Sequence, residues 1–168
     1  MKVIRCNPAD IDLIFEFYDM AIAYQKQQFH KAWMGFERTL VEQDIAEGRQ
    51  WKVVSGDKVA CIFVHTNNDP LIWLEKDADP AIYLHRIVTH DDFRGQHILQ
   101  TIIEWAKGFC AENGRTYIRM DTWSDNQHLI DYYIRSGFAH IGTLVLPDKA
   151  GLPVHYGSSD SALLEMKA

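Results

Sequence analysis

The chain has 168 residues, 47% of them hydrophobic and 24% charged, which fits one globular domain with its own core. Its formal charge of -6 argues against binding to nucleic acid or to an anionic membrane, since both need a concentrated basic face. Three cysteines without C-x-x-C spacing, and no apolar signal core or membrane-length run, predict a cytoplasmic protein.

The N-terminal half predicts a strand, two helices and a hairpin. Asn7 followed by Pro8 is typical of a helix start, because asparagine caps the first turn and proline fits its first position. Apolar residues then recur at helical spacing to about Gln28. The predicted elements are a strand over 2–6, helices over 8–28 and 36–46, and hairpin strands over 51–55 and 59–65.

The C-terminal half alternates strands and helices. The predicted elements are strands over 82–88, 117–121, 138–146 and 162–166, helices over 98–111 and 126–136, and a turn-rich segment over 147–160. The central strand, helix and strand predict a parallel pair with a right-handed crossover, whereas the hairpins predict antiparallel neighbours. The expected fold is therefore an α/β (α+β) fold with a mixed, mostly antiparallel sheet of about seven strands and helices on both faces.

A polar turn joins the predicted strand over 82–88 to the next helix. It contains Arg94 and Gly95 and opens directly into the helix. The first turn of a helix presents unpaired N–H groups and a partial positive charge, which suit a phosphate. Gly95 lets the backbone approach a ligand closely and Arg94 adds a cation, although a glycine here can also serve only to make the bend.

This turn resembles the phosphate turn of the GNAT acetyltransferases, Q/R-x-x-G-x-G/A, with Arg94 to Leu99 in the matching places. A second motif of that family has an Asn, then a Tyr seven residues later, then Gly-Phe, and it resembles the stretch from Asn126 through Tyr133 to Phe138. The likeness covers the chain in element order and is specific from about 82 to 142. It departs at His97 and Leu99, which stand at two glycine positions, where the N–H remains but a Cβ narrows the approach.

The resemblance implies one GNAT-type domain over 1–168, with a sheet that splays between its fourth and fifth strands. It implies acetyl-CoA as co-substrate and direct transfer of an acetyl group to a primary amine of a small molecule in a ternary complex. Family members are often dimers, which makes a homodimer an expectation. The eight histidines show no H-E-x-x-H or comparable spacing, so we expect no metal.

The resemblance also implies which residues bind the cofactor. Main-chain groups of one strand would pair with the pantetheine as a further strand does, and the N–H of Val88 would be a donor to the oxyanion. The helix-start turn would hold the diphosphate, and Asn126 would lie near the pantetheine arm. The cofactor-binding residues are then Ile87, Val88, Thr89, Arg94, Gly95, Gln96, His97, Ile98, Leu99 and Asn126.

By the same resemblance, Tyr133 would be the general acid that protonates the departing thiolate. The general base stays open between His85, Asp121, Glu104 and a water relay. His85 has the pKa best suited to neutral pH, but a hydrogen-bonded histidine in a half-buried strand would also explain it. An aromatic acceptor region is expected at Tyr24, Phe29, Trp33 and Trp123.

Two alternatives remain beside the small-molecule enzyme. The departures at His97 and Leu99 would fit a non-catalytic acyl-CoA-binding module that regulates a partner. A transferase acting on a protein N-terminus or lysine would share the chemistry but need an open, often acidic groove, for which the sequence shows no sign. The three cysteines have no activating neighbour in the sequence, so we expect them to be structural.

Overall fold

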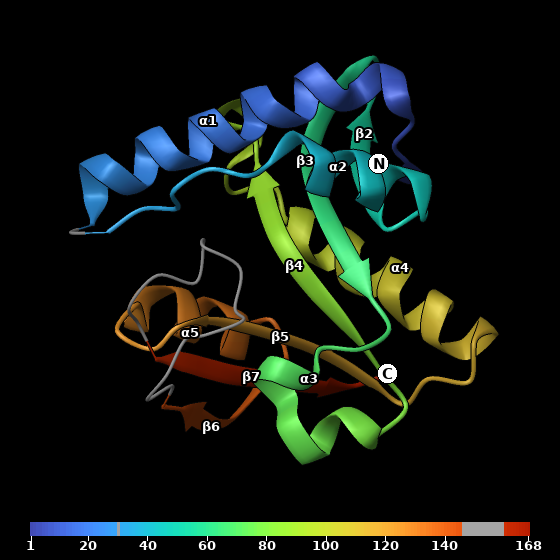
Figure 1. Cartoon of the computed structure of the whole chain (residues 1–168), viewed down its shortest axis with the longest axis vertical. Helices are drawn as coiled ribbons and strands as arrows, with labels where there is room; N and C mark the ends of the chain where they lie inside the picture. Colours follow the sequence, from blue (N-terminus) through green and yellow to red (C-terminus); the bar gives the residue numbers. More distant parts are fainter. Residues whose placement is uncertain (30, 146–159) are drawn as a thin grey trace. The chain divides into compact units, whose positions relative to one another are not determined.

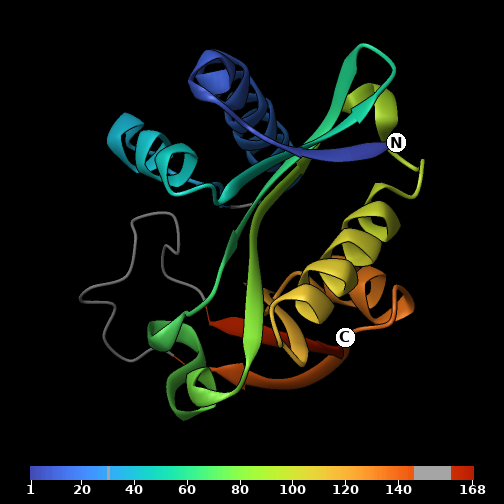
Figure 2. The same ribbon diagram turned by 90° about the vertical axis from the view of Figure 1, so that its right-hand side faces the viewer.

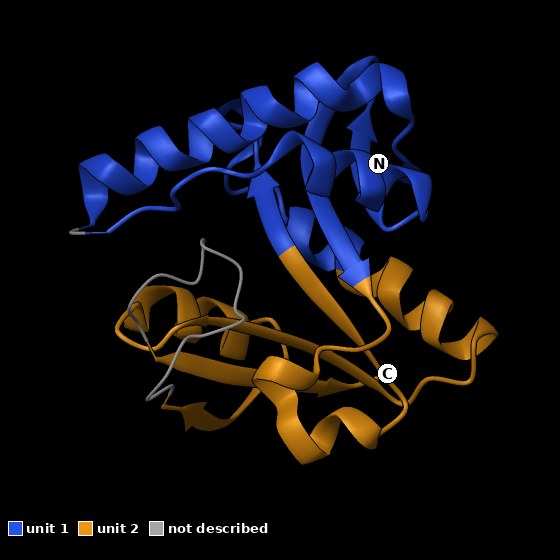
Figure 3. Cartoon of the chain, in the orientation of Figure 1, with its two compact units in different colours: residues 1–65, 86–102 blue, residues 66–85, 103–168 orange. Residues whose placement is uncertain are grey.

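The computed structural model describes residues 1–29, 31–145 and 160–168 of the chain. They group into two compact units, one of residues 1–65 with 86–102 and one of residues 66–85 with 103–168 (Figure 3). Seven strands pair in the order β1-β2-β3-β4-β5-β7-β6, and Figure 1 labels β2 to β7. The pair β4–β5 is parallel, whereas β1–β2, β2–β3, β5–β7 and β6–β7 are antiparallel. The mixed, mostly antiparallel α/β sheet expected from the sequence is confirmed.

Unit 1 combines a three-stranded antiparallel arrangement with two helices. In Figure 2, β1 runs beside the hairpin of β2 and β3. The hairpin turns at Gly56, whose φ of 60° lies in the left-handed region that glycine adopts without strain. The elements are β1 (Lys2–Arg5), η1 (Pro8–Asp10), α1 (Ile11–Gln28), α2 (Arg38–Ala46), β2 (Gln50–Ser55) and β3 (Lys58–Thr66).

The helix start predicted at Asn7 and Pro8 is confirmed by a capping box. The Asn7 side chain accepts from Ala9 N, and the Asp10 side chain accepts from Asn7 N, both at 2.9 Å. Two of the donors that a helix start leaves open are thereby bonded. The apolar face of α1 then packs into the core of unit 1, which contains Ile14, Phe17, Tyr18, Val41, Ile45 and Ile62.

Unit 2 contains the remaining strands and a short helical segment that the sequence does not predict. The segment consists of α3 (Pro70–Trp73) and η2 (Leu74–Ala78). Its turns are too short to show helical periodicity. Ile72 and Trp73 join Ala81 and Tyr83 in a buried cluster that positions it. The other elements are β5 (Tyr117–Trp123), α5 (Gln127–Arg135), β6 (Ala139–Leu144) and β7 (Ser161–Lys167).

Three elements contribute residues to both units, namely β3, of which only Thr66 belongs to unit 2, β4 (Ala81–Thr89) and α4 (Ile98–Glu112). The parallel ladder between β4 and β5 joins only Ala81–Tyr83 to Tyr117–Arg119. The following residues of unit 2 on these strands, His85 and Asp121 among them, lie beyond the last recorded pair. The expected splay between the fourth and fifth strands is therefore present as an early end of their hydrogen bonding.

The turn-rich segment predicted between the last two strands lies outside the described residues except for Asp160. Within the described ranges, no helix is long and apolar enough to cross a membrane.

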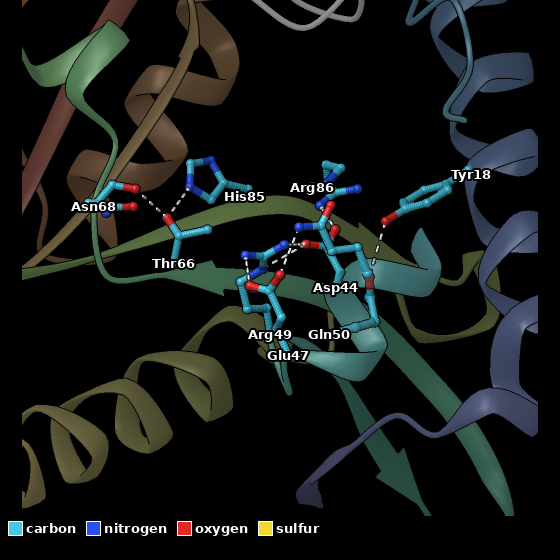
Figure 4. Close-up of polar contacts among 10 residues, drawn as sticks. Tyr18, Asp44, Glu47, Arg49, Gln50, Thr66, Asn68, His85 and Arg86 are labelled. Carbon is cyan, nitrogen blue, oxygen red and sulfur yellow. Dashed lines mark hydrogen bonds and ion pairs between the residues drawn. The ribbon is translucent and has the colours of Figure 1, made fainter. Parts of the chain in front are cut away.

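A buried ion cluster in unit 1 holds an unusual residue of β4. Arg86 has a φ of 49°, a left-handed conformation that costs a non-glycine residue about 1–2 kcal/mol. Its guanidinium donates to the Asp44 carboxylate, whose side chain is 3% exposed and also binds Arg49 at 2.8 Å (Figure 4). The guanidinium also lies 5.3 Å from the Phe36 ring centroid. These contacts hold β4 in its strained conformation.

Replacing Asp44 by Ala should lower the free energy of unfolding by about 3–5 kcal/mol, because it leaves the buried Arg86 guanidinium without its carboxylate. Urea denaturation measures the change. The matched control is Glu42→Ala on the same helix, whose pair with Arg38 is exposed and should be worth less than about 1 kcal/mol. Equal losses in the two variants would contradict this role for Asp44.

Candidate active site

The turn between β4 and α4 is built from tight backbone bonds. Residues 91–93 form the 3₁₀ helix η3 (Asp91–Phe93), and the N–H groups of Arg94 and Gln96 donate to the carbonyls of Asp91 and Phe93. Gly95 has a φ of 78° and His97 a φ of 56°. His97 thus keeps the left-handed backbone that a glycine would adopt at this place.

The first turn of α4 offers donors to a ligand. The N–H groups of Ile98 and Leu99 have no intrahelical acceptor, as at every helix start, whereas Gln100 N already donates to the His97 carbonyl at 3.0 Å. The side chains of Ile98 and Leu99 are 3% and 5% exposed. Leu99, which stands at a glycine position of the family motif, therefore points its side chain into the protein, while its N–H lies at the helix start where a ligand can accept from it.

Arg94 is held in place at the surface of this turn. Its guanidinium binds Asp91 at 2.7 Å and lies over the Tyr24 ring, 4.1 Å from the centroid. Its side chain is still 45% exposed, so donors remain for an anion. Tyr24, predicted for the acceptor region, is thus the ring that supports the cation of the turn.

The end of β4 carries the main-chain groups predicted to face the pantetheine. Val88 is buried, and its backbone contacts the Cys61 thiol, while the Thr89 hydroxyl lies 3.7 Å from the same sulfur. Burial raises the pKa of Cys61 to about 12, so its thiol is protonated at neutral pH. Cys6 and Cys110 are also buried, free and raised in pKa. The prediction that the cysteines are structural is consistent with this burial.

The second motif forms the start and end of α5. The Asn126 side chain accepts from Leu129 N at 3.2 Å, so the predicted cap is present. Tyr133 is half-buried, with the rings of Tyr132 and Phe138 at 5.7 and 6.1 Å. Gly137 follows the helix with a φ of 104°, and a Cβ there would meet the Met166 methyl at 3.0 Å. The positive φ and the close approach of Met166 both favour glycine at position 137.

Two of the candidate bases lie together in unit 2, with a third residue that sequence reasoning missed. Donor or acceptor atoms of Asp69, His85 and Asp121 all lie within 4.8 Å of one another, and the three residues are half-buried. Asp69 directly precedes α3, in a stretch without a predicted element. Glu104, the other candidate, is exposed on α4 and outside this group.

Asp69 has an altered proton affinity. Burial raises the pKa of its carboxyl to about 7, with further increases from the negative charges of Asp121 and Asp77 and a decrease from the Ile72 amide. The atom Asp69 Oδ2 is buried and has no hydrogen-bond partner in the described ranges. A carboxyl that is half protonated near pH 7 can accept or release a proton under ordinary conditions.

The predicted acceptor residues are divided between the units. In unit 1, Phe29 and Trp33 line an open hollow of about 600 Å³, together with the charged Asp19 and Lys26. Trp33 N donates to the Gln25 side chain at 2.8 Å, which fixes the chain after α1. In unit 2, Trp123 is the half-buried last residue of β5 and pairs with Ser161 of β7. Tyr24 does not line the hollow.

The strand, turn and helix described above recur in a known family. A profile of the Acetyltransferase (GNAT) family matches residues 16–138. The chain belongs to this family. A curated relative is the uncharacterized N-acetyltransferase YesJ of Bacillus subtilis, 30% identical over 74 residues. The match spans 44% of this chain and 41% of the relative's length.

Solved GNAT structures share the fold along the whole chain. An acetyltransferase of the family from Listeria monocytogenes has a TM-score of 0.77 at 23% identity and covers 99% of this chain and 94% of its own. A ribosomal-protein-alanine N-acetyltransferase from Brucella melitensis scores 0.69 at 15% identity, with 100% of both chains covered. A spermidine N-acetyltransferase from Vibrio cholerae scores 0.65 at 12% identity, with 99% and 96% covered. At these identities the likeness concerns the fold.

Replacing His97 by Gly should stabilise the chain by up to about 1 kcal/mol, because glycine adopts the φ of 56° without strain. His97→Val should destabilise it, since a β-branched residue is disfavoured there. The matched control is Gln100→Gly inside α4, which should cost about 1 kcal/mol. Chemical denaturation measures all three, and an equal loss in both glycine variants would contradict the strain at His97.

Proposed function

We propose that this protein is an acetyl-CoA-dependent N-acetyltransferase that moves an acetyl group directly to a primary amine of a small molecule. The observation that supports this most is the turn after β4, where His97 keeps a left-handed backbone and the helix-start amides stay available. Membership of the GNAT family makes acetyl-CoA the natural donor for such a turn.

We propose further that residues 1–168 act as one domain, which is supported by β3, β4 and α4, since each contributes residues to both units. A cytoplasmic location is part of the proposal, and three buried cysteines that form no disulfide support it.

The proposed cofactor contacts follow the geometry of unit 1. The diphosphate takes hydrogen bonds from the helix-start amides and from Arg94, whose position on Tyr24 is already fixed. The pantetheine pairs with the main chain of Ile87 to Thr89. The proposed donor to the thioester oxygen is the N–H of Val88, which in the structure bonds to the Cys61 thiol.

Proton transfers complete the proposed reaction. The amine must arrive at the thioester carbon without its extra proton, and His85 and Asp121 are the proposed acceptors. The C–N bond forms, the C–S bond breaks, and the departing thiolate takes a proton from Tyr133. A phenol suits this step, since its ordinary pKa of about 10 lies near that of the thiol it serves.

Acetyl-CoA at about 100 times its dissociation constant should raise the free energy of unfolding by about 2.7 kcal/mol, because it binds only the folded chain. Arg94→Gln should weaken binding measured by calorimetry, since an anion loses its cation. The control is Arg38→Gln, because Arg38 is exposed and pairs only with the surface residues Asp12 and Glu42 among its recorded ion pairs. This variant should leave the affinity for acetyl-CoA unchanged. No heat and no melting shift with acetyl-CoA would refute the proposed function.

Replacing Tyr133 by Phe should lower kcat by roughly 10²-fold and leave acetyl-CoA affinity unchanged, because only the proton donor is removed. The control is Tyr132→Phe, its exposed neighbour on the same helix. Thiol release with a panel of amines measures turnover. Equal kcat values in the two variants would remove Tyr133 from its role.

The same panel separates the alternatives. Acetyl-CoA binding without thiol release from any amine or peptide would favour a regulatory acyl-CoA-binding module. Release with peptide N-termini or lysines, but not with small amines, would make the acceptor a protein.

A further inference from the structure

Three side chains of unit 2 form a cluster at the point where the β4–β5 ladder has ended. They come from separate segments, Asp69 from the start of α3, His85 from β4 and Asp121 from β5. One polar atom of each lies within 4.8 Å of the others. The cluster thus brings two carboxylates and an imidazole to one place.

The hydroxyl of Thr66 determines which nitrogen of His85 carries a hydrogen. Thr66 Oγ1 donates its only hydrogen to the Asn68 carbonyl at 2.9 Å, and His85 Nε2 lies 3.0 Å from the same oxygen (Figure 4). With the hydroxyl hydrogen assigned to the Asn68 carbonyl, Nε2 is the donor in this contact. In the neutral ring the lone pair then lies on Nδ1, which is the atom able to take a proton.

Asp69 faces negative charge from two other elements of unit 2. Asp121 lies on β5, where its Oδ2 accepts from the Ser161 hydroxyl at 3.0 Å, and Asp77 of η2 accepts from Asp69 N at 2.6 Å. His85 on β4 is the facing group that can become positive. The Arg119 guanidinium of the same unit is bound by Asp79 and Glu165. The buried, unpartnered Asp69 Oδ2 therefore stands among acceptors.

A site of this composition is stabilised by taking up one positive charge, since two carboxylates repel each other when both are ionised. On the proposed function, the reaction supplies such a charge, because a primary amine is an ammonium ion at neutral pH. We propose that Asp69, His85 and Asp121 together bind the acceptor as its ammonium ion and take its proton before acetyl transfer.

The proton balance of this step is complete. The ammonium R–NH₃⁺ gives one proton to the cluster, which passes it to water, and R–NH₂ attacks the thioester carbon. As the C–N bond forms and the C–S bond breaks, the nitrogen loses a second proton while the thiolate gains one. The sum is R–NH₃⁺ and acetyl-CoA to the acetamide, free CoA and one H⁺.

The charge of the cluster also selects the acceptor class. A carboxylate beside the reacting nitrogen, as in an amino acid, would lie near Asp69 and Asp121 and be repelled. The acceptor is thus an amine without a neighbouring carboxylate. In matched pairs, tyramine against tyrosine, phenethylamine against phenylalanine and cadaverine against lysine, the amine should give the higher kcat/KM by at least about tenfold.

The first test needs no activity. Because the folded chain binds the Asp69 proton more tightly than the unfolded chain, the stability it adds is full near pH 4 and is lost as pH rises through about 7. The free energy of unfolding of wild type relative to Asp69→Asn should therefore fall over this range. Asp131→Asn, which changes a half-buried carboxyl on α5, is the matched control and is measured over the same range. A constant difference for Asp69→Asn would overturn the proposal.

The second test uses the reaction. In wild type, kcat/KM for the best amine should rise with pH through about 7, as the cluster loses its proton. In Asp69→Asn and in Asp121→Asn, kcat/KM should no longer rise with pH and should be about 10²-fold lower than in wild type at pH 8. In both variants, the ratio of kcat/KM for the amine to kcat/KM for the matching amino acid should be smaller than in wild type. Both should still bind acetyl-CoA, which shows that they are folded, and Asp131→Asn should match wild type.

The outcomes separate this inference from the proposed function. Acetyl-CoA binding and turnover with unchanged rates and pH profiles in both cluster variants would refute the cluster's role and leave the enzyme intact. Absence of acetyl-CoA binding would refute the enzyme, while the unfolding measurements still decide whether Asp69 holds the proton. A melting shift with Zn²⁺ that disappears in Asp69→Asn, together with loss of activity in EDTA, would make this a metal site and overturn the proposal.

Discussion

The buried contact between Asp44 and Arg86 is the interaction on which the middle of β4 depends. A left-handed arginine inside a strand is unfavourable, and a desolvated carboxylate with aromatic rings around the guanidinium compensates for it. His85 stands just before this residue, and Ile87 to Thr89 just after it. The strand is thereby divided into a stretch that carries His85, a proposed base, and a stretch whose main chain is proposed to pair with the pantetheine. Both proposed roles depend on the irregularity at Arg86 between them.

Sequence reasoning succeeded where the cause is local. The cap at Asn7, the turn from Arg94 to Leu99 and the cap at Asn126 each follow from a few consecutive residues, and each is present. The family assignment rests on the same local patterns and is confirmed. The left-handed conformation at His97 could not be predicted, because histidine is not the residue that usually reports it.

Reasoning from sequence failed where distant residues decide. Asp69 directly precedes the four-residue α3 and the five-residue η2, which carry no periodic pattern, and only the fold brings it to Asp121. Arg119 is similar, because an arginine that is 1% exposed looks like a surface residue until Asp79 and Glu165 are found around it. A charged side chain can be buried only where other residues pair with it, and a single sequence does not show which residues those are.

Arg119 connects three elements of unit 2. Arg119 lies on β5, and its guanidinium donates to Glu165 on β7. The same guanidinium binds the Lys76 carbonyl and Asp79 at the end of the α3–η2 segment. Tyr83, which accepts from Arg119 at 3.3 Å, is also bonded to Asp77. The α3–η2 segment, which Asp69 directly precedes, is therefore held at its end by Arg119. Loss of Glu165 or Asp79 would therefore loosen the segment that follows Asp69, although neither residue belongs to the Asp69 cluster.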